Sequence, residues 1–447
     1  KSFGFTVSVT DSVIEEPFLL KLKTYNEGYL ILKDSVLISD KQKTNIQLNT
    51  GNYTGFAELS IGDNLVCGFI INKNEPNLNL RFNTEKYSKE GIAFNNTKDN
   101  LLYSELLSIK EKFNTSFRNI YEAKSNLMPL DSFYLNKQLQ YEHQYEQLYN
   151  QINIVADSIL KKDSLNYTSI LADFLKVPTQ KYFPALSNSF DNYDALLHYH
   201  YFDFIDFSNP LILNHPALKD YIYNYFTLYC INTPENLKQG IDIIMKQSNK
   251  NTQVKNYVFN VLIDLFLEGK NDAIINYLYE NYADGCAVQL SNSKQQTAFE
   301  SIVYTQVGAT IPNIILNDSK NELQSLLRNA SKNKYTIVYV WMSSCHACET
   351  KTPKLAQTIA PYLKKGLGVY SISLDEEKDD WFEAIVKYDI KSWTNVSELT
   401  ALQNASVLPK LNIRATPKLF IIDKNGIIVA KDIFGTDLLN KLNKLLN

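Results

Sequence analysis

Two cysteines, Cys345 and Cys348, stand at the point where a strand-like segment passes into a helix-like segment. Residues 335–341 form an almost continuous apolar run, as expected for a buried central strand. Residues 349–363 have the apolar spacing of a helix. C-x-x-C spacing at such a junction predicts a redox-active dithiol. This feature constrains the fold most, because the site requires a strand that leads directly into a helix.

The expected helix N-terminus gives the two cysteines different roles. Free backbone N–H groups and the helix dipole stabilise negative charge there, so we expect Cys345 to be the exposed thiolate that attacks. We expect Cys348, one turn later on the same face, to be the buried thiol that resolves a mixed disulfide. His346, when protonated, would place positive charge beside the thiolate and raise the oxidising power of the pair. A solvent-exposed spacer is the alternative interpretation of His346.

Zinc binding is the competing interpretation of a C-x-x-C pair. A zinc site usually takes four ligands from two such pairs, and the sequence contains no second pair. The other three of the five cysteines, Cys67, Cys230 and Cys286, are isolated and are interpreted as small buried apolar residues. We therefore predict no metal site and no cofactor.

Hydrophobic periodicity divides the 447 residues into three parts. Residues 1–95 contain short alternating segments separated by Asn- and Gly-rich turns, which predict an all-β sandwich. Residues 96–300 have a helical period interrupted by prolines, and residues 305–447 alternate strand and helix patterns. The predicted fold class is multi-domain, with an N-terminal β-sandwich, a central all-α region and a C-terminal α/β domain.

Two clusters of side chains in the predicted helical region have the residue types of a binding site. Tyr141, Tyr145 and Tyr149 share one helix face; core packing is the preferred interpretation and a ligand groove the alternative. His198 and His200 are separated by one residue and would diverge on a helix, which disfavours a metal site.

Composition argues against several classes of protein. The formal net charge is −3, from 45 basic and 48 acidic residues, which does not indicate a nucleic-acid-binding protein. No apolar run reaches the roughly 18–20 residues of a membrane helix. The first residue is Lys, and a removed signal peptide is one expectation for this start, with a trimmed start as the alternative.

Further motifs accompany the cysteines in residues 305–447. They are Trp341 at the strand end, Pro353 in the helix, the Thr416–Pro417 pair before an apolar strand, and the turn residues 423–426. Together they resemble the thioredoxin-like domain of TlpA-type thiol–disulfide oxidoreductases. The resemblance implies a thioredoxin-like fold, a cis peptide bond before Pro417, and substrate contacts by Trp341, Thr416 and Pro417.

The resemblance also implies a function. It implies disulfide exchange with protein substrates, together with a redox donor protein as partner. The β-rich start, residues 1–95, is similar to the domain of unknown function in multi-domain thioredoxin-like proteins of Bacteroidetes, which are often exported lipoproteins. A periplasmic or cell-envelope location is therefore expected, with a lipid anchor at a removed N-terminus as one option. The direction of electron flow stays open.

Several positions depart from the family pattern. Ser344 stands where Trp usually precedes the first cysteine, and His346 and Ala347 replace the usual dipeptide. Tyr339 and Lys351 stand where many members keep a buried acid. The sequence therefore leaves open how Cys348 is deprotonated.

Two other functions were weighed. Peroxide reduction would call for a Thr and a Pro where this chain has Met342 and Val338, so it is disfavoured. The other is an extracytoplasmic binding protein in which residues 1–300 recognise a partner and the redox domain is vestigial or regulatory. The reduction potential of the cysteine pair would discriminate this reading from an oxidoreductase.

Overall fold

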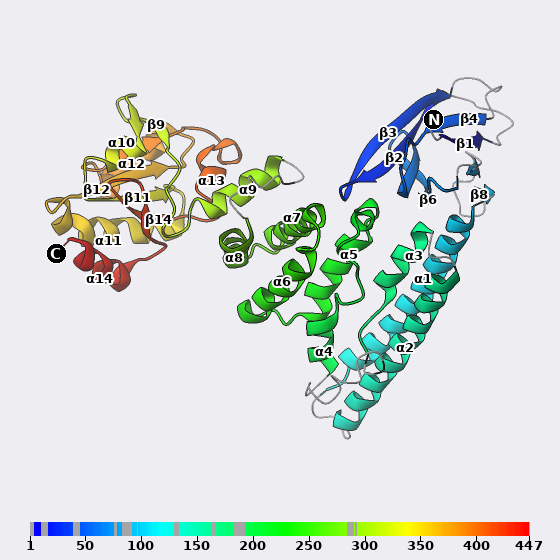
Figure 1. Ribbon diagram of the computed structural model, residues 1–447. Helices are drawn as coiled ribbons and strands as arrows, with labels where there is room; N and C mark the ends of the chain where they lie inside the picture. Colours follow the sequence, from blue (N-terminus) through cyan, green and yellow to red (C-terminus); the bar gives the residue numbers. More distant parts are fainter. Residues whose placement is uncertain are drawn as a thin grey trace. The chain divides into compact units, whose positions relative to one another are not determined.

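The computed structural model contains two compact units, Lys1–Leu265 and Phe266–Asn447, and each is described by itself (Figure 1). The residues described are 4–9, 17–38, 45–75, 78–82, 92–95, 97–128, 134–162, 166–179, 181, 193–283, 290 and 293–446. The domain limits expected from the sequence, at 95 and near 300, stay predictions. Within the described residues, no helix is both long and apolar enough to cross a membrane.

The first unit begins with two four-stranded sheets, ordered β3-β2-β5-β6 and β4-β1-β7-β8. Val7, Leu48 and Leu80 of one sheet share a core with Leu20 and Leu59 of the other, so the sheets form the predicted sandwich. The strands are β1 (Gly4–Val9), β2 (Phe18–Asn26), β3 (Tyr29–Ile38), β4 (Asn45–Asn49), β5 (Gly55–Ile61), β6 (Asn64–Ile71), β7 (Asn79–Phe82) and β8 (Ile92–Asn95).

Helices make up the rest of the first unit, as predicted for the central region. A buried carboxylate, Asp99, joins them to the sandwich: it accepts hydrogen bonds from the side chain of Asn72 and from the backbone N–H groups of Tyr167 and Thr168. The elements are α1 (Lys98–Ser125), α2 (Tyr134–Lys162), α3 (Tyr167–Ala172), η2 (Asp173–Leu175), α4 (Tyr193–His200), η3 (Pro210–Asn214), α5 (Ala217–Asn224), the π-helical turn η4 (Tyr225–Tyr229), α6 (Pro234–Ser248) and α7 (Thr252–Glu268).

The second unit is built on a seven-stranded mixed sheet in the order β10-β9-β13-β12-β11-β14-β15. The central strand β11 runs parallel to β12 and antiparallel to β14. Its strands are β9 (Ile315–Asp318), β10 (Leu323–Ser325), β11 (Tyr335–Trp341), β12 (Leu367–Ser373), β13 (Thr394–Ser397), β14 (Lys418–Asp423) and β15 (Ile428–Lys431). Its helices are α8 (Asp272–Tyr282), α9 (Ser293–Val303), α10 (Leu326–Ala330), α11 (His346–Leu363), α12 (Lys378–Lys387), η5 (Leu402–Asn404), α13 (Val407–Lys410) and α14 (Gly435–Leu446).

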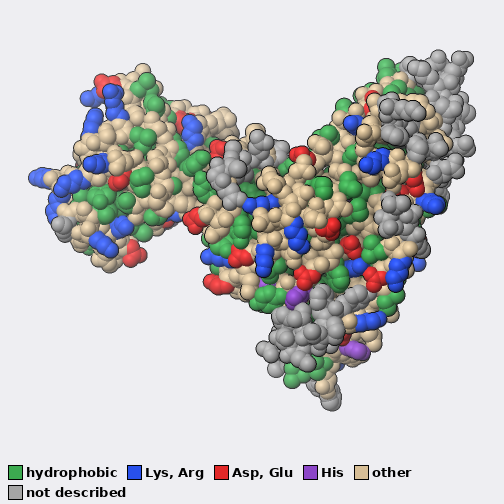
Figure 2. All heavy atoms as spheres, viewed as in Figure 1, with side chains coloured by type: hydrophobic (Ala, Val, Ile, Leu, Met, Phe, Trp, Pro, Cys, Tyr) green, Lys and Arg blue, Asp and Glu red, His purple; other side chains and the backbone are tan. Residues whose placement is uncertain are grey.

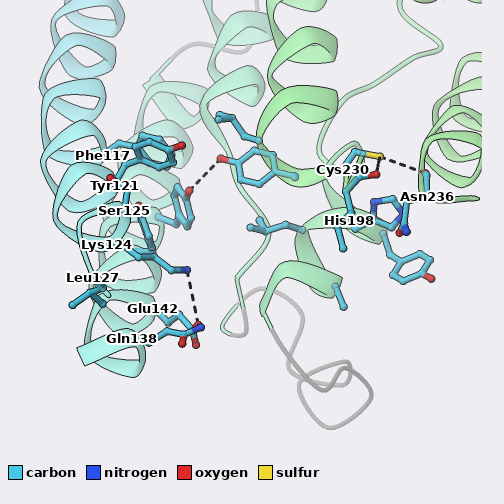
Figure 3. A pocket seen from close by; sticks show the side chains of 18 of the residues that line it. Phe117, Tyr121, Lys124, Ser125, Leu127, Gln138, Glu142, His198, Cys230 and Asn236 are labelled. Carbon is cyan, nitrogen blue, oxygen red and sulfur yellow. Dashed lines mark hydrogen bonds and ion pairs between the residues drawn. The ribbon is translucent and has the colours of Figure 1, made fainter. Parts of the chain in front are cut away.

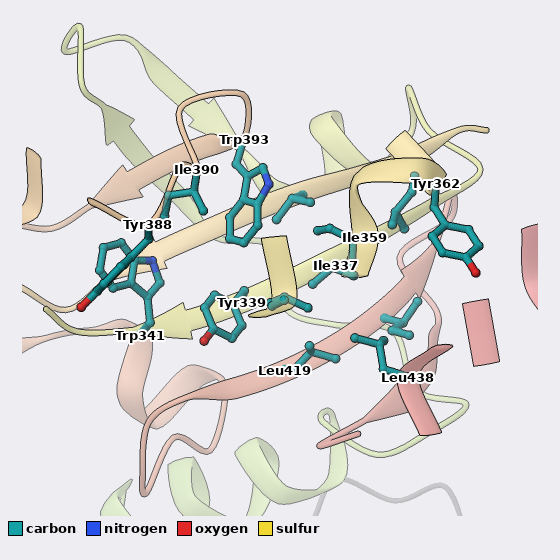
Figure 4. Packing of buried hydrophobic residues seen from close by; sticks show 14 of the residues in the cluster. Ile337, Tyr339, Trp341, Ile359, Tyr362, Tyr388, Ile390, Trp393, Leu419 and Leu438 are labelled. Atoms are coloured by element: carbon teal, nitrogen blue, oxygen red, sulfur yellow. The ribbon is translucent and has the colours of Figure 1, made fainter. Parts of the chain in front are cut away.

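Strand β11 is apolar throughout because both of its faces are covered. Ile337, Tyr339 and Trp341 lie in a core shared with α11, α12 and α14 (Figure 4). Val338 and Val340, which alternate with them along the strand, lie in a second core with α10 and α13. The predicted α/β fold is confirmed, and β11 is its central strand.

Two local elements of the second unit owe their form to strand pairing. Helix α10 begins only at Leu326, because residues 323–325 pair with β9 and Ser325 caps the helix by accepting a hydrogen bond from the Arg328 N–H. Strand β13 was not predicted. Its sequence is Thr-Asn-Val-Ser, and its extended form comes from parallel pairing with β12.

On the face shown in Figure 2, both basic and acidic side chains lie on each unit. This agrees with a net charge close to zero.

Candidate redox site

The two cysteines lie where the sequence pattern places them, between β11 and α11. Cys345 is the N-cap of α11, and its Sγ accepts a hydrogen bond from the backbone N–H of Cys348 at 3.3 Å. Cys345 is partly exposed and Cys348 is fully buried. The geometry therefore offers one sulfur to an incoming partner and keeps the other behind it.

The surroundings shift the pKa values of the two thiols in opposite directions. Partial burial opposes ionisation of Cys345, but hydrogen bonds from the Cys348 thiol and from the N–H groups of Cys348 and Ala347 outweigh it and lower the pKa of Cys345. Burial, followed by the hydrogen bond to Cys345, raises the pKa of Cys348 to about 12. The first thiolate to form is therefore that of Cys345.

A cis peptide bond joins Thr416 to Pro417, as the resemblance implied. The Thr416 carbonyl oxygen lies 3.4 Å from the Cys345 Sγ and accepts its hydrogen bond. The sheet produces this proximity: Lys418, which follows the proline, pairs with Val340 near the end of β11. The Thr416 backbone of the proline loop thus lies beside the attacking sulfur.

Asp375 is a residue that the sequence reasoning missed. It lies just beyond β12, is 5% exposed, and accepts hydrogen bonds from the backbone N–H and the hydroxyl of Ser343 at 2.8 and 2.7 Å. Ser373 donates to its other oxygen at 2.7 Å. The carboxylate therefore fixes the segment that leads to Cys345. An acid directly after a strand parallel to the C-x-x-C strand was the available signal.

Trp341 does not line a substrate surface, which corrects that expectation. Its side chain is 0% exposed, and its indole N–H donates to the Ser371 hydroxyl at 2.7 Å. Figure 4 shows it packed beside Tyr388, with ring centroids 5.7 Å apart, in the core under the site. Tyr339 lies in the same core and hydrogen bonds the Thr352 hydroxyl at 2.9 Å. Tyr339 and Trp341 therefore support the site from beneath.

His346 is exposed at the first position of α11. Its side chain is 95% exposed, and its Nδ1 lies 3.9 Å from the Glu349 carboxylate, which also binds the Lys387 Nζ at 2.8 Å. The hydrogen bond and charge of Lys387 lower the pKa of Glu349. An effect of His346 on the cysteine pair stays a prediction.

The other cysteines and histidines form no second site in the described part of the chain. Burial raises the pKa of Cys67 to about 12 and that of Cys230 to about 11, while Cys286 lies outside the described residues. His198 hydrogen bonds Tyr225 and Gln239, whereas His200 binds Asp203, so the two imidazoles have different partners. No cluster of three or more metal-ligating residues occurs among the described residues.

The tyrosine face of α2 combines core packing with a cavity. Tyr145 and Tyr149 are buried and pack with Phe117, as preferred from the sequence. They also line a cavity of about 660 Å³, whose opposite wall carries His198 and Cys230 (Figure 3). Core packing is therefore confirmed for Tyr145 and Tyr149, and a ligand role for this face stays a prediction.

Comparisons with known proteins find matches to the C-terminal part of the chain. A family model described as the AhpC/TSA family matches residues 307–431. Thioredoxin-like protein SkfH of Bacillus subtilis is 24% identical over 116 residues, which cover 26% of this chain and 77% of that protein. The thioredoxin domain of a thiol-disulfide oxidoreductase from Bacteroides vulgatus is 32% identical, covering 32% of this chain and 99% of that one, with a TM-score of 0.29. A thiol:disulfide interchange protein from Bacteroides sp. is 31% identical, covering 32% and 92%, with a TM-score of 0.29.

Proposed function

We propose that this chain, whose C-terminal third carries a thioredoxin-like domain of the AhpC/TSA family, exchanges disulfides with protein substrates through Cys345 and Cys348. The observation that carries the proposal is the asymmetry of the pair. Cys345 is accessible, caps a helix and has a lowered pKa, whereas Cys348 is buried behind it with a raised pKa. Thiol–disulfide exchange needs such an attacking thiolate and a nearby resolving thiol.

The reaction balances over two exchanges. The Cys345 thiolate attacks one sulfur of a substrate disulfide, forms a mixed disulfide and releases the other substrate sulfur as a thiolate, which takes up a proton. Cys348 then loses its proton and attacks the Cys345 sulfur, releasing the second substrate thiolate, which also takes up a proton. The substrate gains two electrons and two protons, and the protein holds a Cys345–Cys348 disulfide. The same steps in reverse oxidise a dithiol substrate.

The proline loop suggests how a polypeptide substrate docks. Thr416 and Pro417 are half-buried and Ala415 is exposed beside Cys345. An extended segment lying along this backbone would bring its disulfide to the sulfur. We therefore propose Thr416 and Pro417 as substrate-binding residues and Trp341 as a supporting residue.

Partners and location follow from the same proposal. A protein of this kind needs a redox donor or acceptor that regenerates Cys345 and Cys348 after each turnover. We propose a periplasmic or cell-envelope location, on the resemblance to exported thiol–disulfide oxidoreductases. Mass spectrometry of the N-terminus of the protein from its native cells tests this; an unprocessed cytoplasmic chain would contradict it.

Insulin reduction by the full chain tests the activity. We expect turbidity from insulin reduction with dithiothreitol as donor in the wild type, and the uncatalysed rate with Cys345→Ser. Cys348→Ser should accumulate a mixed disulfide that dithiothreitol releases. The proposal fails if the wild type is inactive and Cys348→Ser traps no substrate. Peroxide consumption above the Cys345→Ser rate would instead point to peroxide chemistry.

A further inference from the structure

We propose that Asp272 is a positioning residue for the proline loop, acting from a helix outside the thioredoxin-like domain. The proposal rests on the proposed function, because its effect is on the docking of a polypeptide at Cys345. Asp272 opens α8, whereas the family match begins at residue 307.

One carboxylate holds two side chains of the loop. Its Oδ1 accepts a hydrogen bond from the Arg414 Nη2 at 2.8 Å, and its Oδ2 accepts one from the Asn412 Nδ2 at 2.9 Å. All of these contacts lie within the second unit. A two-point contact fixes orientation as well as distance, which a single ion pair does not.

The held segment leads directly to the cis bond. Asn412 has a φ of +48°, a left-handed conformation that a fixed side chain helps to maintain. Downstream, the loop is held again where Lys418 pairs with β11. Between these anchors lies the Thr416 carbonyl, 3.4 Å from the Cys345 Sγ. Asp272 therefore fixes the upstream end of the segment that presents backbone at the attacking sulfur.

Helix α8 is itself well placed to act as a support. Asn271 caps it by accepting the Ile274 N–H, and Ile274, Ile275 and Leu278 are buried. α8 packs on α9, which packs on α13, the helix just before the loop. Helix α8 is thus connected to the loop directly through the Asp272 hydrogen bonds and indirectly through α9 and α13.

The expected size of the effect is modest because the contact is half in water. The Asp272 side chain is 31% exposed and that of Arg414 is 46% exposed. Solvent screens contacts of this exposure, and their loss should weaken the binding equilibrium of a polypeptide substrate by about fivefold at most. We expect that change in substrate docking and no change in the chemistry of Cys345.

The test compares a polypeptide substrate with a small reagent in the full-length protein. Asp272→Ala should lower kcat/KM for insulin reduction about fivefold, mainly through KM. Alkylation of Cys345 by iodoacetamide, which needs no docking backbone, should keep its wild-type rate. Arg414→Ala should lower kcat/KM in the same direction but by less, because it leaves the Asn412 contact in place. The double variant should be no worse than Asp272→Ala alone, because Asp272→Ala already removes the contact with Arg414.

A matched control is Glu235→Ala, which removes an exposed carboxylate from the first turn of α6 in the first unit. Glu235→Ala should leave the rates of insulin reduction and of Cys345 alkylation unchanged. Arg414→Lys, which keeps the positive charge, should leave both rates within about twofold of the wild type. The proposal is overturned if Asp272→Ala reduces insulin with wild-type kinetics, or if the losses of kcat/KM in the two single variants add up in the double variant. It is also overturned if the alkylation rate of Cys345 falls as much as kcat/KM for insulin. If the wild type itself does not reduce insulin, the proposed function fails, and the positioning role falls with it.

Discussion

Replacement of Cys348 tests how the Cys345 thiolate is stabilised. Cys348→Ala removes the thiol that donates to Cys345, whereas Cys348→Ser keeps a donor of similar size. The backbone N–H of Cys348, 3.3 Å from the Cys345 Sγ, is present in both variants. The pair of substitutions therefore isolates a single hydrogen bond.

The structure sets the size of the expected effects. Loss of one hydrogen bond to the thiolate costs about 1 kcal/mol, which raises the pKa of Cys345 by about 0.7 unit. In the wild type, the pKa of Cys345 lies below its ordinary value, and that of Cys348 is about 12. The difference makes Cys345 the more ionised of the two thiols near neutral pH.

The reduced protein is treated briefly with iodoacetamide over a range of pH and then analysed by peptide mapping. This experiment measures the pH dependence of Cys345 alkylation and the relative labelling of Cys345 and Cys348. We expect Cys345 to be alkylated first. The pH at which its alkylation rate is half-maximal should lie below about pH 8.5 in the wild type. This midpoint should be close to the wild-type midpoint in Cys348→Ser and higher than it in Cys348→Ala. Reactivity increases with pH because the thiolate reacts. Equal midpoints in Cys348→Ala and the wild type, or equal labelling of Cys348 and Cys345, would refute the reasoning.

Three further substitutions probe the surroundings. Ser371→Ala leaves the buried indole N–H of Trp341 without its acceptor and should destabilise the second unit by about 1–3 kcal/mol in urea unfolding; an unchanged transition would contradict this. Asp375→Ala removes the acceptor of the Ser343 N–H and should cost about 1–3 kcal/mol and slow insulin reduction, and a wild-type rate would argue against a positioning role. His346→Ala should make the reduction potential more negative by about 10–20 mV, whereas an unchanged potential would exclude a charge effect of this side chain.

The strand–helix unit of the site was predictable because its signals are local. An apolar run at 335–341 can only be buried on both faces, and the C-x-x-C must then follow the strand end. The extended form of β13 was not predictable, since Thr394–Ser397 is polar and becomes a strand through its pairing with β12. Tertiary pairing outweighs propensity there.

The site residues likewise divide into those set by local sequence and those set by tertiary pairing. The different roles expected of the cysteines depend on the helix N-terminus, which is a local property. The position of Asp375 depends on register, because parallel pairing sets Trp341 opposite Ser373 and so brings the next residues of both strands together. Trp341 was misjudged because its expected substrate contact rested on the family resemblance alone, whereas both faces of β11 are covered and the side chain is buried.

The absence of the usual acid at Tyr339 and Lys351 has a kinetic consequence. Burial is the first cause of the raised pKa of Cys348, and it persists after Cys345 enters a mixed disulfide, although the hydrogen bond to Cys345 is then altered. Tyr339, hydrogen bonded to Thr352 in the core, also has a raised pKa from burial and is no base near neutral pH.

Resolution of the mixed disulfide should therefore be limited by the small thiolate fraction of Cys348. We expect its rate, measured by quenched flow with a single-disulfide peptide, to rise about tenfold per pH unit from pH 6 to 9, because the thiolate fraction does so below the pKa. A rate that levels off near pH 7 would refute this, since it requires a base that titrates there.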